Sequence, residues 1–236
     1  MNTVEQIRAE LFSMQDEEYR LFQAKLMPEV PVDTVIGVRM PALRAYAKKL
    51  HGSVSEQEFL QALPHLYYEE NNLHMALLEY ISDPALALER LEEFLPFLDN
   101  WATCDSFCPK VLLRHSPLFL SHIRSWLMSP HAFTVRYGLV RLLSFLDEPL
   151  FCEEILRLAA SVEQEEYYVR MAQAWFFSIA LIKHEKETLP YLHKRKLSPW
   201  VHNKAIQKAR ESLRCSPEYK QALSKLRVPN PSKAGI

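Results

Sequence analysis

The sequence predicts an all-α fold, and three observations lead to that prediction. Apolar residues recur with the spacing of an α-helix along nearly the whole chain. Only four glycines occur in 236 residues, fewer than the turns of a β-rich or βαβ nucleotide-binding fold normally need. The prolines number 15, and many stand where a helix would begin, as in "SPEYKQAL" and "DPALALERL".

Three helices are expected before residue 53, each with one apolar face. Their marker residues are Val4, Ile7 and Leu11 for the first, Leu21, Phe22 and Leu26 for the second, and Leu43, Ala47 and Leu50 for the third. The segment "MPEVPVDTVIGVRMPALR" is predicted as a loop because it combines three prolines, a glycine and β-branched residues. Gly52 is predicted to end the third helix at its C′ position.

The rest of the chain is predicted as further helices joined by short turns. Ser55 and Glu58 in "SEQEFLQAL" have the spacing of a capping box. The helical segments that follow, in chain order, are "YYEENNLHMALLEYIS", "PALALERLEEFLPFL", "CDSFCPKVLLRHS", "PLFLSHIRSWLMS", "AFTVRYGLVRLLSFL", "FCEEILRLAASV", "EEYYVRMAQAWFFSIALI", "KETLPYLHKRK", "SPWVHNKAIQKARESLR" and "SPEYKQALSKLR".

These helices form pairs of about 30 to 45 residues, the period of HEAT-like or armadillo-like arrays. One pair cannot bury its apolar face alone and has to stack on its neighbours. We therefore expect a right-handed superhelical solenoid of HEAT-like antiparallel helix pairs, forming a single domain over residues 1–228 with a disordered tail at 229–236. An irregular helical bundle is the alternative.

The net charge of −1 conceals a strong asymmetry. Residues 1–182 carry a charge of −10, with 15 Lys and Arg against 25 Asp and Glu, whereas residues 183–236 carry +9, with 13 against 4. A basic end at 183–228 suggests a polyanion as partner. The alternatives are an ordinary solvated surface or pairing with the acidic part.

Several function classes lack their sequence signals. The N-terminus resembles no signal peptide, and no run of about 20 apolar residues suggests a membrane span, so we expect a soluble, cytoplasmic protein. Cys104 and Cys108 form a C-x3-C without a second ligand pair, which favours buried thiols over a zinc or redox site. The nine histidines show no H-E-x-x-H, and no P-loop, G-x-G-x-x-G or G-x-S-x-G is present.

The stretch "DNWATCD" offers the best candidate for chemistry. Trp101 and Asp105 are four residues apart, which places them on one face of a helix that Asp99 or Asn100 could cap. Arg136 and Trp175 lie on two later alternate helices, and a parallel stack would bring such positions to one concave face. An aromatic surface with a carboxylate and a guanidinium suits a flat, cationic substrate on a phosphate backbone. A core Trp with a surface Asp is the alternative.

The chain resembles the HEAT-like DNA alkylation repair glycosylases of the AlkD type. The resemblance runs from about Phe22 to Leu226 and rests on the order of several motifs. These are "MPEVPVDTVIGVRMPALRAYAKKL", "YYEENNLHMALL", "NWATCD", "TVRYGLVRLL", "AQAWFFSIAL" and "NKAIQKARESLRCSPEYKQAL". It implies hydrolysis of the N-glycosidic bond of N3- or N7-alkylated purines in double-stranded DNA, without base flipping and without a metal or organic cofactor. We expect a monomer, because nothing in the sequence demands an oligomer.

The resemblance also implies a role for each candidate residue. Asp105 would stabilise the oxocarbenium-like sugar and direct a water molecule, Trp101 and Trp175 would flank the deoxyribose, and Arg136 would hold a phosphate. The basic end would follow the DNA backbone. Its candidate residues are Lys194, Arg195, Lys196, Lys204, Lys208, Arg210 and Arg214. The second hypothesis is a catalytically inactive HEAT-like module that binds DNA or a protein.

Overall fold

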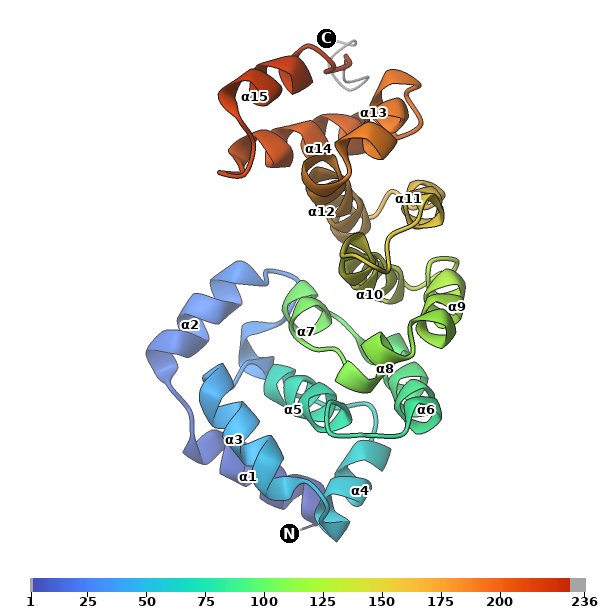
Figure 1. Ribbon diagram of the computed structural model, residues 1–236. Coiled ribbons are helices and arrows are strands. Elements are labelled where there is room, and N and C mark those ends of the chain that lie inside the picture. The colour runs from blue at the N-terminus through green and yellow to red at the C-terminus, as the bar shows by residue number, and fades with distance from the viewer. Residues whose placement is uncertain (1, 230–236) are drawn as a thin grey trace. The chain divides into compact units, whose positions relative to one another are not determined.

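The computed structural model describes residues 2–229, and every regular element among them is a helix (Figure 1). The all-α prediction is therefore confirmed. The chain forms two compact units, Met1–Phe119 and Leu120–Ile236, each with its own internal packing. The prediction of one HEAT-like domain over 1–228 stays a prediction, and nearly all of the predicted tail lies outside the described residues.

The first unit contains most of the helices. They are α1 (Thr3–Ser13), α2 (Glu17–Leu26), the 3-10 helix η1 (Val32–Thr34), α3 (Met40–Leu50), α4 (Val54–Gln61), α5 (Tyr68–Leu78), α6 (Pro84–Phe94), the 3-10 helix η2 (Leu95–Phe97), α7 (Trp101–Ser106) and α8 (Lys110–Arg114). Helix α9 (Ser116–Trp126) contains the boundary between the units.

The central element of the first unit is α5. All of its residues are buried, because α3, α4, α6 and α7 pack around it. Its apolar residues Leu73, Met75 and Leu77 belong to the core, and its polar first turn is buried with them. Buried polar groups require internal partners, and α5 supplies these to the segments that surround it.

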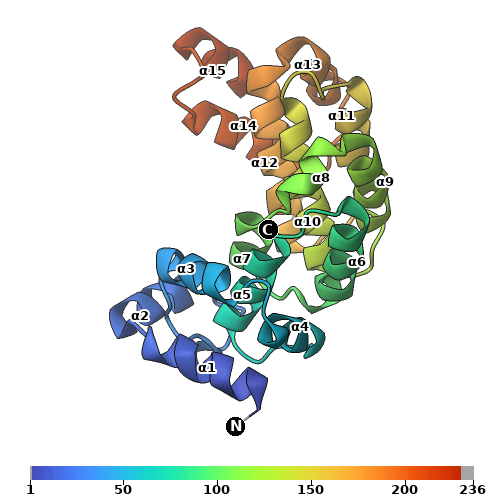
Figure 2. The same cartoon turned by 60° about the horizontal axis from the view of Figure 1, so that its bottom comes forward.

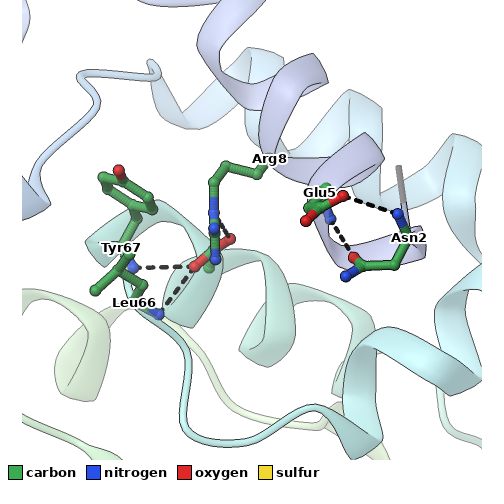
Figure 3. A network of polar contacts seen from close by, with 6 residues as sticks. Asn2, Glu5, Arg8, Leu66 and Tyr67 are labelled. Carbon is green, nitrogen blue, oxygen red and sulfur yellow. Dashed lines mark hydrogen bonds and ion pairs between the residues drawn. The ribbon is translucent and has the colours of Figure 1, made fainter.

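The two adjacent carboxylates of α5 hold two different segments of the chain. Glu70 accepts hydrogen bonds from the amides of Leu66 (2.9 Å) and Tyr67 (3.0 Å) and pairs with the Arg8 guanidinium of α1 (2.9 Å) (Figure 3). It thereby caps α5 and ties the helix to α1. Glu69 instead accepts from three amides of the segment that leads into α3.

That segment is the predicted loop, and the structure confirms it over residues 27–39, where η1 is the only regular element. Gly37 has a φ of +94°, and a side chain there would lie 2.6 Å from Cβ of Arg20 and from the carbonyl oxygen of Asp16. The loop and the start of α2 approach so closely that only glycine fits. The last part of the quoted segment, from Met40 on, is the first turn of α3.

Two predictions about where helices begin and end were wrong. The N-cap of α4 is Ser53, whose hydroxyl accepts from the amide of Glu56 at 3.1 Å, and not Ser55. Both serines precede a glutamate by three residues, but Ser53 directly follows the turn at Gly52, which has the predicted C′ conformation with φ +81°. The segment "CDSFCPKVLLRHS" is two helices rather than one, because Pro109 prevents the helix from continuing between α7 and α8.

The second unit is built as two layers of helices. Its elements are α10 (Ala132–Leu142), the 3-10 helix η3 (Leu143–Leu146), α11 (Glu153–Ala160), α12 (Tyr167–Lys183), α13 (Glu185–His193), α14 (Pro199–Glu211) and α15 (Pro217–Ser224). Helix α12 packs between α10 and α14 in one layer, and α11 and α13 cover it from the other (Figure 2). In the part of the chain that the structure describes, no helix is long and apolar enough to cross a membrane.

Candidate functional site

The candidate site begins at the N-terminus of α7. Asn100 is the N-cap of this six-residue helix, and its side-chain oxygen accepts from the amide of Thr103 at 2.8 Å. This resolves the choice between Asp99 and Asn100 as the cap. Trp101 is the first residue of the helix and Asp105 the fifth, so the predicted placement of both on one helical face holds.

The Trp101 indole is anchored to the neighbouring helix. Its Nε1–H donates to the carbonyl oxygen of Leu26, the last residue of α2, at 3.0 Å. The ring packs, half-buried, against an apolar cluster. This cluster contains Met27, Val30, Val35, Tyr68 and Ala102. The bond satisfies one of the carbonyls that a helix C-terminus leaves without an intrahelical donor, and it fixes the orientation of the indole.

A buried polar network, which sequence reasoning missed, connects the start of α7 to α5. The Thr103 hydroxyl donates to Asn72 Oδ1 of α5 at 2.8 Å and accepts from Asn100 Nδ2 at 3.1 Å. Tyr68 joins through a hydrogen bond to Asn72, and burial raises the pKa of the Tyr68 phenol to about 12. The only sequence signal for this network is the polar run "YYEENN" inside an otherwise apolar helix.

Two residues hold the C-terminal end of α7: Arg44 of α3 and Glu79, the C-cap of α5. Glu79 accepts from the amide of Cys108 at 3.1 Å and forms an ion pair with Arg44. The Arg44 guanidinium donates to the carbonyl oxygen of Ser106 at 3.4 Å and lies 4.9 Å over the Phe107 ring. Other elements therefore hold both ends of α7, and Asp105, near the end of this short helix, is half-buried.

In the second unit, Arg136 lies between two helices. It belongs to α10, is 6% exposed, and donates from Nη1 to the carbonyl oxygen of Tyr168 in α12 at 2.8 Å. Trp175 is half-buried on the same α12, seven residues further on, which is about 10 Å along the helix axis. Arg136 therefore ties α10 to the first turn of α12, while Trp175 occupies the middle of that helix.

One of the predicted basic residues, Lys208, is close enough to Arg136 and to Lys204 to be affected by both charges. Lys204 and Lys208 are half-buried one turn apart on α14. Burial lowers the pKa of the Lys208 ammonium, and the neighbouring positive charges of Lys204 and Arg136 lower it further, against the opposing effect of Glu211. Such mutual repulsion is the electrostatic setting in which an external anion binds favourably.

The remaining basic residues are exposed. Lys194, Arg195 and Lys196 form the turn after α13, and Lys196 Nζ lies 4.9 Å over the Tyr191 ring. Arg210 and Arg214 are exposed near the end of α14. Because successive residues of a helix are about 100° apart, Arg210 does not share the face of Lys204 and Lys208. The predicted basic set thus separates into an exposed group and a half-buried pair.

The structure brings Trp101 together with Asp105 in the first unit, and Lys208 together with Lys204 and Arg136 in the second. The first unit also has two cavities of 370 and 330 Å³, between α4 and α6 and among α1, α3 and α4. Neither cavity is lined by a candidate residue. Within residues 2–229, no group of three or more His, Cys, Asp or Glu side chains is arranged to hold a metal ion.

A family model described as DNA alkylation repair enzyme matches residues 7–209, and this range contains every candidate residue named above except Arg210 and Arg214. No curated protein matches the chain.

Proposed function

We propose that this chain, which belongs to the DNA alkylation repair enzyme family, is a DNA glycosylase that hydrolyses the N-glycosidic bond of N3- and N7-alkylated purines in double-stranded DNA. The observation that carries the proposal is the pairing of Trp101 and Asp105 on one face of α7. Both ends of this helix are fixed by hydrogen bonds to other elements, and the preorganisation of charge is what such a reaction needs.

The substrate makes modest demands on the protein. An alkylated purine is cationic, so the bond from C1′ to the base breaks with its electron pair leaving on the purine, which becomes neutral. The sugar develops oxocarbenium character, which the Asp105 carboxylate stabilises electrostatically. Water then adds its oxygen to C1′ and releases a proton to Asp105 or to solvent. No metal or organic cofactor takes part in this scheme.

The Trp101 ring has a separate role in the proposal. Its face attracts the cationic purine and the electron-poor sugar, an interaction of about 0.5–2 kcal/mol. The hydrogen bond from its Nε1 to the Leu26 carbonyl holds the ring in one orientation. We assign Trp175 a similar role and Arg136 a phosphate contact. Arg136 is buried, and its guanidinium also donates to the Tyr168 carbonyl.

The half-buried cations of α14 suit the DNA backbone as ligand. Lys208 lies close enough to Lys204 and Arg136 to be repelled by both, and a phosphate relieves this repulsion. The exposed residues Lys194, Arg195, Lys196, Arg210 and Arg214 add longer-range attraction. The proposal includes HEAT-like pairing of the helices, action without base flipping, a monomeric state and a cytoplasmic location.

The test is release of 7-methylguanine from a defined duplex. We expect release by the unmutated protein and a loss of about 100-fold or more in Asp105→Asn, because one preorganised charge at the reacting centre contributes that much. Asp99→Asn is the matched control: it removes the same charge from an exposed position two residues before α7 and should retain release.

Two results would contradict the proposal. Equal losses in Asp99→Asn and Asp105→Asn would show that Asp105 has no specific role. A folded unmutated protein that releases no alkylated base, beside a glycosylase that does, would favour the inactive module that only binds DNA or a protein.

A further inference from the structure

A row of aromatic rings runs across the N-terminal ends of α10, α12 and α14. Phe133 of α10 and Tyr168 of α12 have ring centroids 5.5 Å apart, and Tyr168 and Tyr167 are edge-to-face at 5.2 Å. Tyr167 in turn meets Trp200 of α14 edge-to-face at 6.1 Å. Within this row Tyr167 is 53% exposed, so its ring is open to a ligand.

Arg170 lies beside this row without an anionic partner. Its guanidinium carbon is 4.9 Å over the Trp200 ring, and its Nε is buried without a hydrogen-bond partner among the described residues. No carboxylate of residues 2–229 lies within ion-pair distance of it, whereas Arg124 of the same unit pairs with Glu154 at 2.7 Å. A stacked guanidinium with unused donors is suited to bind a phosphate.

The cationic surface continues along α14. Trp200, Lys204 and Lys208 recur every fourth residue and therefore share one face of the helix. Among the described residues, neither lysine has a carboxylate within ion-pair distance; Lys204 Nζ contacts only the Gln207 amide oxygen, at 3.3 Å. Exposed carboxylates bound this surface at one edge. They are Glu163, Glu165 and Glu166, in the segment before α12.

We propose that Tyr167, Arg170 and Trp200 form a single-strand-binding surface, on which an unstacked DNA base lies against Tyr167 and the adjoining phosphate binds Arg170. The strand continues over Lys204 and Lys208. Aromatic rings interleaved with cations are the chemistry by which proteins bind single-stranded nucleic acid. A duplex would stack less on Tyr167, because the faces of its bases are already covered by neighbouring bases. The inference rests on the proposed function in taking DNA as the ligand.

The experiment measures binding by fluorescence anisotropy with the full-length protein and undamaged, labelled DNA. One probe is a single-stranded oligonucleotide, and the other is the duplex of the same sequence. We expect Tyr167→Ala to weaken single-strand binding by about 5- to 100-fold and duplex binding by less than about twofold. We expect Arg170→Gln to weaken binding of both the single strand and the duplex. For the single strand it should also reduce the slope of log affinity against log salt concentration by about 0.7, the value for one lost phosphate contact.

Two control variants match these changes. Arg124→Gln removes a positive charge from the same unit at a position already paired with Glu154, and Tyr80→Ala removes a ring that is 40% exposed in the first unit. Both should bind like the unmutated protein. The inference is overturned if Tyr167→Ala binds the single strand as tightly as these controls, or if it weakens the single strand and the duplex equally. It is also overturned if the unmutated protein does not bind single-stranded DNA.

Failure of this inference is distinguishable from failure of the proposed function. Base release from an alkylated duplex depends on Asp105 in that proposal, whereas the binding assay uses undamaged DNA. Release with unchanged binding by Tyr167→Ala would retain the glycosylase and remove the single-strand surface. Single-strand binding that depends on Tyr167, in a protein that releases no base, would retain the single-strand surface and remove the glycosylase.

Discussion

Glu69 shows how one buried side chain fixes a whole segment. Its Oε2 accepts from the Ile36 amide at 2.8 Å, and its Oε1 accepts from the amides of Gly37 at 2.7 Å and Val38 at 3.2 Å. Burial raises the pKa of the Glu69 carboxyl, and the three amides oppose that effect by stabilising the ionised form. The carboxylate therefore replaces a strand or helix as the hydrogen-bond partner of the loop before α3.

We predict that Glu69→Gln destabilises the protein by about 1–3 kcal/mol. The glutamine keeps one acceptor oxygen but directs an N–H₂ group at one of the loop amides, so at least one buried donor loses its partner. The free energy of unfolding in urea measures the effect. Glu89→Gln, an exposed position on α6, serves as control, and equal midpoints for the two variants would contradict the prediction.

A contact between the half-buried His65 and the buried His74 predicts an acid-sensitive fold. The His65 Nε2 and His74 Nδ1 atoms are 2.9 Å apart, and the two rings stack on Phe59 and Phe94 respectively. Burial lowers the pKa of His65 to about 4, with Glu70 opposing and Arg8 adding to the shift. Burial also lowers the pKa of His74 well below its usual value, and the charges of His65 and Arg90 add to that shift.

The sign of the effect follows from these directions. Histidines that are harder to protonate in the folded state stabilise it above about pH 6.5, and this stability is lost as the pH falls toward 4. We predict that His65→Leu reduces the slope of the unfolding free energy between pH 6.5 and 4.5 by about 1.4 kcal/mol per pH unit. The raised pKa of Glu69 acts in the opposite direction but is common to both proteins. Parallel curves would refute the assignment.

At the scale of single elements, α7 depends on its cap more than a longer helix would. Asn100 accepts from the Thr103 amide and also donates to the Thr103 hydroxyl. We predict that Asn100→Ala costs about 1–2 kcal/mol and, on the proposed function, lowers release of 7-methylguanine through displacement of Trp101 and Asp105. Asn100→Ser, which retains a capping oxygen, should recover part of both. Loss of stability without any loss of release would separate the cap from the site.

Helix α2 approaches the loop before α3 most closely at Gly37. None of its residues is buried, and it meets the loop where Gly37 faces Arg20 and Asp16. We predict that Gly37→Ala costs about 1–3 kcal/mol more than Gly52→Ala. Both glycines have positive φ, but a side chain at Gly52 would meet no atom within 4 Å. Thermal unfolding of the two variants gives the comparison, and equal melting temperatures would mean that α2 moves aside without cost.

At the scale of the whole molecule, the proposed function makes the charge of the basic segment the main determinant of how DNA binding would respond to salt. The net charge is only −1, yet residues 183–236 carry +9. We predict that Lys208→Gln reduces the slope of log affinity for duplex DNA against log salt by about 0.9, the value for one lost phosphate contact. Lys110→Gln, at an exposed position of α8, should leave the slope unchanged. Equal slopes for both variants would remove Lys208 from the interface.

The sequence predicted the positions of the helices better than their burial and their contacts with one another. The helical period indicated α10 and α12 because apolar spacing depends only on neighbouring residues. The same reasoning could not show that α5 is buried on every side, because its polar first turn has the composition of a solvated helix. At the site, the spacing of Trp101 and Asp105 was readable, whereas their supports Leu26, Asn72 and Glu79 are distant in the chain. Arg170 and Trp200 meet only through the packing of α12 on α14.

The bond between the Trp101 indole and the Leu26 carbonyl has a consequence for spectroscopy. The chain has four tryptophans, of which Trp101 belongs to the first unit and Trp126, Trp175 and Trp200 belong to the second. Each indole N–H gives one signal in a proton–nitrogen correlation spectrum. The Trp101 signal reports whether α2 is docked, because a lost carbonyl acceptor shifts the resonance of its N–H proton. Isotope labelling alone therefore lets a titration with any ligand be followed in both units at once.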